Sequence, residues 1–265
     1  ELCAVTRKAA GGDFTVRAPE KSEGEIAVLN DSFNQMIEKI GQLVEDIRVE
    51  QLNLRATELK LLQAQINPHF LYNTLDTIIW LAEAGRKEEV VMMVTTLSDF
   101  FRTTLSKGRD YISVKEEEAH IRSYLQIQQF RYRDILEYTI EIPEELYDYP
   151  ILKLTLQPLV ENALYHGIKN KRGLGHIRVT GCKDGKVLRF TVQDNGRGMT
   201  AEELTKVRKG LESEEKADAA DPSGFGLQNV AQRMRLNYGP EYGITIKSTF
   251  GEGTEMTVTI PAVKK

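Results

Sequence analysis

Residues 156–167 read LQPLVENALYHG and place polar side chains inside a mostly apolar stretch that predicts a buried helix over 151–168. The polar groups are the carboxylate of Glu161, the amide of Asn162 and the imidazole of His166. Buried polar groups cost free energy unless a partner satisfies them. A nucleotide carrying Mg²⁺ is such a partner, because Mg²⁺ prefers oxygen ligands and an asparagine carbonyl supplies one. This stretch therefore predicts a nucleotide site built on a helix.

Two glycine-rich segments further along the chain bear on the same prediction. Residues 194–198 read DNGRG and follow a predicted strand, and residues 224–227 read GFGL and precede a predicted helix. Glycine lets the backbone approach a ligand closely, and a helix N-terminus offers N–H groups to an anion. Either segment alone is more often a pair of tight turns than a phosphate site. Together with the polar helix, they favour nucleotide binding.

The C-terminal half mixes strands with helices. A strand is predicted at 138–142, a hairpin around 183–185, a helix over 226–237, and a final hairpin made by 244–246 and 256–260. Residues 200–222 are polar, rich in Ala, Glu and Lys, and too long for an ordinary connection, so we expect a lid or a disordered loop there.

The N-terminal half up to about residue 135 is predicted to be entirely helical. Between 40 and 83 the strong helix breakers are Gly41 and Pro68, and apolar residues recur at seven-residue spacing at Ile40, Ile47, Leu54 and Leu61, and again at Leu52, Leu59 and Ile66. This spacing predicts a coiled-coil seam that runs into a helical bundle. A second helix after Gly85 places one apolar stripe at Val90, Val94, Leu97, Phe101 and Leu105. A third helix opens at Ser113 with Glu116 three residues later, which is a capping-box pattern.

Residues 1–48 are predicted to form two short helices around a connector that contains Gly11, Gly12 and Pro19. The second helix starts near Glu23 and carries a narrow apolar stripe. A stripe this narrow on an isolated helix favours packing against a partner chain.

Composition excludes several classes of protein. The 265 residues carry a formal net charge of −4, which does not favour a nucleic-acid-binding surface. Two cysteines, Cys3 and Cys182, argue against a disulfide framework and against a cysteine-based metal site. No apolar run reaches the roughly 18–20 residues that cross a bilayer. The chain begins with Glu1 rather than Met, so we expect a fragment of a longer protein.

Four motifs in this order resemble the ATP-binding domain of the GHKL superfamily: Glu161-Asn162, Asp194-x-Gly196-x-Gly198, Gly224-x-Gly226-Leu227 and Gly251-x-Gly253-Thr254. The resemblance implies an α/β sandwich that holds ATP between helices and a flexible lid. It implies that Asp194 accepts a hydrogen bond from the adenine amino group, that Asn162 binds Mg²⁺ and that Glu161 acts as a base or polarising group. It further implies nucleotide contacts from Gly196, Gly198, Gly224, Phe225, Gly226, Leu227 and Thr254.

The N-terminal half is similar to one group within that superfamily. Residues 65–73, QINPHFLYN, resemble the phosphoacceptor segment of LytS/YesM-type sensor histidine kinases, with His69 as the acceptor. Residues 1–48 look like a HAMP signal-relay domain that lacks its start, and such domains follow a transmembrane helix. The resemblance implies three parts: a HAMP-like segment at 1–48, dimerisation and phosphotransfer helices at 49–135, and the ATP-binding domain at 136–265.

This sequence departs from the wider histidine-kinase pattern at two positions. Phe70 stands where the larger group has an acidic residue after the histidine, so the base for His69 is expected to be Glu161. Tyr165 stands where many relatives have a lysine near the phosphates, so His166 or Lys169 is expected to replace it. The two histidines without a motif, His120 and His176, are assigned to the surface.

Asn73 lies four residues after His69, one helical turn further on the same face. A polar residue at this spacing in histidine kinases is associated with dephosphorylation of the partner, by positioning a water. The alternative, weighted equally, is that Asn73 satisfies the carbonyl freed by Pro68, because proline inside a helix removes a hydrogen bond at a cost of about 3 kcal/mol.

The resemblance implies the cytoplasmic portion of a membrane-bound sensor kinase that works as a homodimer. It would autophosphorylate His69 with ATP and Mg²⁺ and pass the phosphoryl group to an aspartate on the receiver domain of a response regulator. The sensor region would lie before Glu1, and no nucleic acid is expected as a partner. Two alternatives remain: an ATPase clamp of the GHKL type without phosphorelay, and a non-catalytic dimeric relay.

Overall fold

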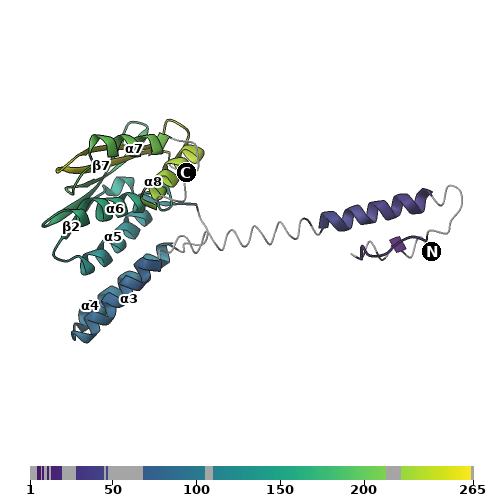
Figure 1. Ribbon diagram of the computed structural model, residues 1–265, viewed down its shortest axis with the longest axis horizontal. Coiled ribbons are helices and arrows are strands. Elements are labelled where there is room, and N and C mark those ends of the chain that lie inside the picture. The colour runs from purple at the N-terminus through teal and green to yellow at the C-terminus, as the bar shows by residue number, and fades with distance from the viewer. Residues whose placement is uncertain are drawn as a thin grey trace. The chain divides into compact units, whose positions relative to one another are not determined.

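The computed structural model describes residues 5–6, 8, 11, 13–19, 28–44, 46, 68–104, 110–212 and 222–263, with side chains from residue 226 onward in the last range. The chain forms two compact units, 1–70 and 71–265 (Figure 1). The predicted seam residues Ile47, Leu54 and Leu61 lie outside the described residues, as do Leu52, Leu59, Ile66 and Leu105.

In the first unit, a helix over 28–44 packs against an extended segment at 13–19. Phe33 and Ile37 of the helix bury with Ala18, and Val5, Phe14 and Val16 pack around them. The Asn34 side chain joins the two pieces, because its Oδ1 accepts the Ala18 N–H at 2.7 Å and its Nδ2 donates to the Ala18 carbonyl at 3.2 Å. The predicted second helix is confirmed over the described positions.

The second unit begins inside a helical hairpin made of α3 (Pro68–Glu83) and α4 (Lys87–Thr104). Gly85 adopts a φ of +71° in the turn between them, a conformation that glycine reaches without strain. Met93, Thr96, Phe100 and Thr104 form the buried side of α4. This buried side differs from the stripe predicted at Val90, Val94, Leu97 and Phe101, where Val94 is 49% exposed.

Helix α5 (Val114–Arg131) follows the short strand β1 (Tyr111–Ser113) and packs against α4. The predicted capping box at its start is confirmed: Ser113 Oγ accepts the Glu116 N–H at 3.1 Å, and the Glu116 carboxylate accepts the Ser113 N–H at 2.8 Å. These two bonds satisfy backbone donors that a helix start leaves without intrahelical partners.

Among the described residues, five strands form the main sheet in the order β2-β4-β5-β7-β6. The strands are β2 (Leu136–Glu141), β4 (Gly175–Asp184), β5 (Val187–Asp194), β6 (Gly243–Thr249) and β7 (Gly253–Pro261). Strands β2 and β4 pair in parallel, and the other pairs are antiparallel. Both predicted hairpins, β4–β5 and β6–β7, are therefore confirmed.

Helices pack against this sheet and build the second layer of an α/β domain (Figure 1). They are α5, α7 (Ala201–Glu212), α8 (Pro222–Tyr238) and the turn over Ala163–Gly167 that follows α6 (Gln157–Asn162). Alternate residues of β5, namely Leu188, Phe190, Val192 and Asp194, face the buried side. The alternation places Asp194 at the edge of the apolar core, where β5 ends.

Two predictions about helix boundaries are wrong. Residues 151–156 are not helical: β3 (Pro150–Leu152) pairs with β1, and Leu154 has a φ of +58°, so the helix starts only at Gln157, next to Pro158. Past Asn162 it continues as a π-helical turn over Ala163–Gly167. The second error concerns the loop expected within 200–222, because 201–212 form α7; residues 213–221 lie outside the described ones. Thr200 and Glu203 cap α7 reciprocally, at 2.9 and 3.2 Å.

Candidate active site

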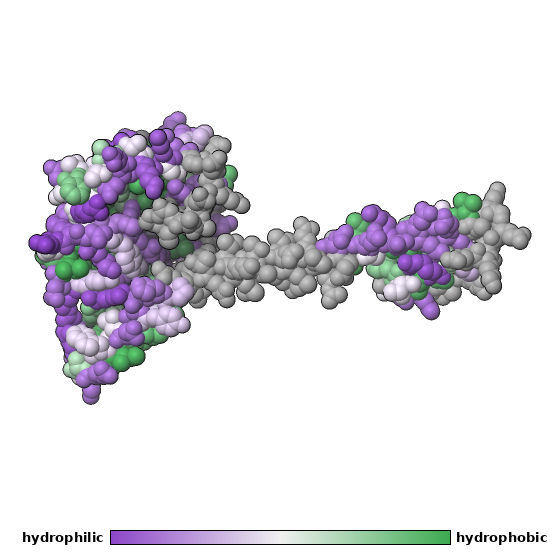
Figure 2. All heavy atoms as spheres, viewed as in Figure 1, coloured by the Kyte–Doolittle hydropathy of each residue, from purple (hydrophilic) through white to green (hydrophobic). Residues whose placement is uncertain are grey.

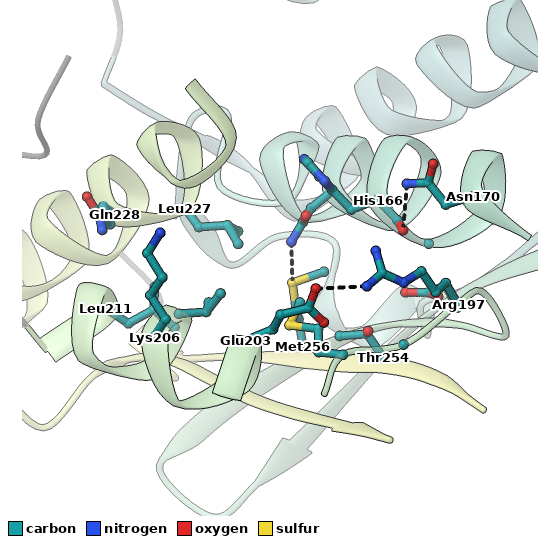
Figure 3. Close-up of a pocket in the computed structure, with 16 residues that line it drawn as sticks. His166, Asn170, Arg197, Glu203, Lys206, Leu211, Leu227, Gln228, Thr254 and Met256 are labelled. Atoms are coloured by element: carbon teal, nitrogen blue, oxygen red, sulfur yellow. Dashed lines mark hydrogen bonds and ion pairs between the residues drawn. The ribbon is translucent and has the colours of Figure 1, made fainter. Parts of the chain in front are cut away.

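A cavity of about 280 Å³ lies between the α6 segment, α7, α8 and the end of the sheet (Figure 3). Six of the residues predicted from the sequence line it: Asn162, His166, Asp194, Gly198, Leu227 and Thr254. They come from segments up to 92 residues apart in sequence (Asn162 to Thr254), so the fold brings most of the predicted nucleotide residues to one place.

Asp194 ends β5 and is only 3% exposed. Burial raises the pKa of its carboxyl group to about 6, and N–H groups of Gly196 and Thr254 oppose this rise by bonding to the carboxylate. The bond from Gly196 to Oδ1 measures 2.8 Å. The cavity wall therefore contains a buried acceptor in a fixed position, which suits recognition of an amino group.

The glycines after Asp194 serve the packing of the loop itself. A Cβ on Gly196 would lie 2.3 Å from the Gly167 carbonyl carbon, and one on Gly198 would lie 1.9 Å from the Thr249 oxygen. Gly198 also has a φ of +68°, which glycine tolerates. Gly196 is absent from the described cavity wall and packs behind Asp194, whereas Gly198 forms part of the wall.

Asn162 of α6 also lines the cavity, and its Nδ2 donates to Met256 Sδ at 3.4 Å. A thioether is a weak acceptor, so this contact orients the amide without offering it a strong partner. The described residues contain no cluster of three or more His, Cys, Asp or Glu side chains that would hold a metal. A cavity wall that offers the Asn162 amide oxygen fits Mg²⁺, because this ion keeps several waters and binds through one or two protein oxygens and substrate phosphates.

Two cationic residues that sequence reasoning missed line the cavity. Arg197 pairs with Glu203 at 2.8 Å and lies 5.5 Å from the centre of the Phe250 ring, and Lys206 projects from α7 (Figure 3). Arg197 stands within the quoted DNGRG motif. Lys206 could have been predicted to line the cavity only if 201–212 had been predicted to form a helix. The capping pattern of Thr200 and Glu203 was the signal in the sequence for that helix.

Lys169 lies elsewhere. Its ammonium group sits 5.1 Å from the ring centre of Tyr132 and 5.0 Å from that of Tyr165, and it is not part of the described cavity wall. His166, the other residue predicted to replace the missing lysine, does line the cavity. Asn170 holds the backbone there by donating to the His166 carbonyl at 3.2 Å.

Glu161 lies on a different face of the helix from Asn162. Successive helical residues point about 100° apart, so Asn162 lines the cavity while Glu161 stays outside its described wall. Gln157 Nε2 donates to Glu161 Oε1 at 2.8 Å. Burial raises the pKa of the Glu161 carboxyl group above its ordinary value, and the Gln157 bond partly opposes that rise.

His69 and Asn73 lie on α3, one turn apart. The His69 side chain is exposed, and Asn73 is partly buried. In the described part of the chain the Asn73 Nδ2 has no hydrogen-bond partner. The described helix begins at Pro68, so the expectation that Pro68 lies in a helix interior concerns residues outside the described ones.

The assignment of His120 to the surface is wrong. His120 is 1% exposed and lies between α4 and α6, because α5 packs against both helices. The remaining predicted residues belong to α8: Gly224 and Phe225 fall outside the described side chains, Gly226 is exposed, and Leu227 is buried in the cavity wall.

Three family models match the chain. A histidine kinase model covers residues 57–136, a model of histidine kinase-, DNA gyrase B- and HSP90-like ATPases covers 147–264, and a HAMP domain model covers 4–42. The ATPase match implies that the C-terminal domain binds ATP.

Curated relatives match over most of this chain. Sensor histidine kinase YesM of Bacillus subtilis is 37% identical over 243 residues, which is 92% of this chain and 40% of that protein. Sensor histidine kinase BtsS of Escherichia coli is 32% identical over 208 residues, 78% of this chain and 34% of that protein. The chain thus spans well under half of the length of these relatives.

A solved histidine kinase domain from a blue-light activated kinase of Erythrobacter litoralis covers 77% of this chain and 93% of its own, at 15% identity and a TM-score of 0.43. Across the described residues, no helix is both long and apolar enough to span a membrane.

Proposed function

Because this chain belongs to the sensor histidine kinases of the LytS/YesM type, we propose that it phosphorylates His69 with the γ-phosphoryl group of ATP. An aspartate in the receiver domain of a response regulator would then accept the phosphoryl group. One observation carries the proposal. A buried acceptor, Asp194, and an amide, Asn162, line a single cavity, while the neighbouring Glu161 lies on another face of the helix, outside the described cavity wall.

Different cavity residues would contact different parts of the nucleotide. Asp194 accepts the adenine amino group, with Thr254, Gly198 and Leu227 around it. Arg197, Lys206 and His166 supply positive charge or hydrogen-bond donors toward the phosphates. Mg²⁺ bound near Asn162 would neutralise charge on the phosphates and polarise the transferring group.

Phosphotransfer begins with a neutral His69, one ring nitrogen of which attacks the γ-phosphorus. The N–P bond forms as the P–O bond to ADP breaks, and ADP leaves with that bonding pair. The proton on the second ring nitrogen passes to the Glu161 carboxylate, so the product imidazole is neutral. A raised pKa suits this role, because a base with a pKa closer to the working pH accepts a proton more readily.

We also propose the division into a HAMP-like segment at 1–48, phosphotransfer helices at 49–135 and an ATP-binding domain at 136–265. The phosphotransfer helices would pair with those of a second copy. Support comes from the hairpin of α3 and α4, where Ile79, Trp80 and Val91 are 54%, 59% and 66% exposed, and apolar patches appear at the lower left of Figure 2. The chain would be the cytoplasmic portion of a membrane-bound sensor.

Asn73 is proposed to position a water for dephosphorylation of the regulator. Its amide nitrogen has no hydrogen-bond partner in the described structure, although an amide that served only to satisfy the backbone would have one. Asn73 also borders a hollow beside Thr77, Trp80 and Arg131, which leaves room for a water or a phosphoryl oxygen.

Incubation with γ-labelled ATP and Mg²⁺ tests the proposal. Acid-labile, alkali-stable label on the protein identifies phosphohistidine. Release of phosphate without label would indicate an ATPase clamp. A protein that neither labels nor releases phosphate would be a relay module, and either of the last two results overturns the proposal.

A further inference from the structure

A continuous series of hydrogen bonds crosses three helices of the second unit and ends at Glu161. Thr103 Oγ1 of α4 lies 2.7 Å from His120 Nδ1, and His120 Nε2 of α5 lies 2.6 Å from Gln157 Oε1. Gln157 Nε2 of α6 then donates to Glu161 Oε1 at 2.8 Å. The His120 ring also stacks on Phe100, with centres 4.6 Å apart and planes at 21°.

The charge on Glu161 fixes the direction of every bond in this series. An ionised carboxylate only accepts hydrogen bonds, so Gln157 must present its NH₂ group to Glu161 and its carbonyl oxygen to His120. His120 Nε2 must therefore carry a hydrogen. In a neutral imidazole the other nitrogen, Nδ1, is then an acceptor. The Thr103 hydroxyl has one hydrogen, and the carbonyl oxygens of Asp99 and Phe100 lie 3.1 and 2.9 Å from its Oγ1 as rival acceptors, so this assignment requires the hydroxyl to donate to Nδ1 rather than to those carbonyls.

The burial of His120 agrees with this assignment. Burial lowers the pKa of its imidazole to about 4, and the nearby Lys153 ammonium lowers it further, so the ring is neutral at physiological pH. Tyr124 of α5, which lies close to Glu161, and its neighbour Tyr165 beyond α6 are further titratable groups on the Glu161 side, and both are phenols. His120 thus offers Gln157 one fixed donor.

We infer that His120 is a positioning residue for phosphotransfer, acting through Gln157 to orient the carboxylate of Glu161. The inference rests on the proposed role of Glu161 as the base for His69. Without the His120 donor, the Gln157 carbonyl oxygen loses its partner, and the amide is no longer held from both ends in the position from which its NH₂ group reaches Glu161.

The same contacts tie the base to the hairpin. Both groups that hold the His120 ring, Thr103 and Phe100, belong to α4. The orientation of Glu161 therefore depends on where α4 lies against α5, although α4 contributes no residue to the cavity wall among the described residues.

Three single variants test the inference. His120→Leu keeps bulk but removes both ring nitrogens, and His120→Gln keeps an amide donor close to the position of Nε2. Ile121→Val, a fully buried neighbour on α5, controls for loss of packing. The measurements are the autophosphorylation rate at saturating ATP across pH and the ATP affinity by calorimetry.

His120→Leu should lower the rate at saturating ATP by about 10-fold or more, with ATP affinity within about two-fold of wild type. The acidic limb of the pH–rate profile of this variant should move to higher pH, because the Gln157 bond that lowers the Glu161 pKa is weakened. His120→Gln should recover most of the rate, and Ile121→Val should keep the wild-type pH profile. A His120→Leu rate and profile like those of Ile121→Val would overturn the inference.

Glu161→Gln, alone and combined with His120→Leu, separates this inference from the proposed function. Wild-type labelling by Glu161→Gln would remove the proposed base. If Glu161→Gln labels poorly while His120→Leu labels like wild type, only the positioning role of His120 is removed. If both are correct, the double variant is no slower than Glu161→Gln, because the two residues act as one unit; additive losses would contradict the inference.

Nitrogen-15 NMR of the histidine rings gives a readout that needs no nucleotide and no activity. The His120 signals, assigned by their loss in His120→Gln, should report the neutral tautomer with hydrogen on Nε2 at pH 7, and Gln157→Leu should perturb them. A tautomer with hydrogen on Nδ1 would overturn the assigned direction and the inference with it.

Discussion

The buried His120 makes the folding stability of the second unit depend on pH in a direction that can be measured. Its pKa is lowered from 6.5 to about 4, so between these values the unfolded chain binds a proton that the folded protein excludes. Stability from this group is therefore complete above about pH 6.5 and is lost as pH falls toward 4. The full difference of about 2.5 pKa units corresponds to about 3.4 kcal/mol, and about 2.5 kcal/mol of it is lost between pH 7.5 and 4.5.

The contribution of His120 to the pH dependence of stability must be separated from that of buried carboxyl groups, which changes stability in the opposite direction. Burial raises the pKa of Glu117 to about 7 and that of Asp194 to about 6, so these groups add stability as pH falls. They remain in a His120→Leu variant, so subtracting its unfolding free energy from that of wild type cancels them. Urea unfolding followed by circular dichroism supplies both curves.

The wild type should lose about 2.5 kcal/mol more than His120→Leu between pH 7.5 and 4.5, whatever the overall cost of the substitution. Parallel stability curves for the two proteins would show that His120 protonates without penalty. The ring would then not be held neutral, and the reasoning would be refuted.

Three further predictions concern the nucleotide, the dimer and Asn73. Asp194→Asn should weaken ATP and ADP binding alike by 10-fold or more, whereas the effect of Asn162→Asp should depend on Mg²⁺; calorimetry that shows equal nucleotide affinity in Asp194→Asn and wild type would remove the adenine role. The chain should have the mass of a homodimer by light scattering at micromolar concentration, because the hairpin exposes Trp80, Val91 and Val94, and a monomer mass would refute this. Asn73→Ala should keep autophosphorylation and thermal stability but lose phosphatase activity toward the phosphorylated regulator, and a joint fall of all three would indicate a structural role.

Elements with local signals were predictable from the sequence. The capping box at Ser113 and Glu116 and the turn at Gly185 involve residues close together in the chain, and both are found in the structure. The same kind of signal at Thr200 and Glu203 marked the start of α7, but the polar composition of 200–222 was interpreted as a loop.

Features that depend on distant partners were not predictable. Glu117 looks like a surface residue at a helix start, yet it is fully buried and accepts backbone N–H groups of Leu154 and Leu156 at 3.0 and 2.8 Å. These groups lie 37 and 39 residues away in sequence and precede the first turn of α6. His120 was missed for the same reason, because Thr103 and Gln157 lie on two other helices.

The central claim, that His69 is the phosphoacceptor, is tested most directly by labelling a His69→Gln variant beside wild type with γ-labelled ATP and measuring ATP affinity on the same samples. The substitution replaces an exposed side chain on α3, so folding and nucleotide binding should be preserved. We predict acid-labile, alkali-stable label on wild type and none on the variant at equal ATP affinity. Phosphohistidine that persists in the variant would contradict the claim.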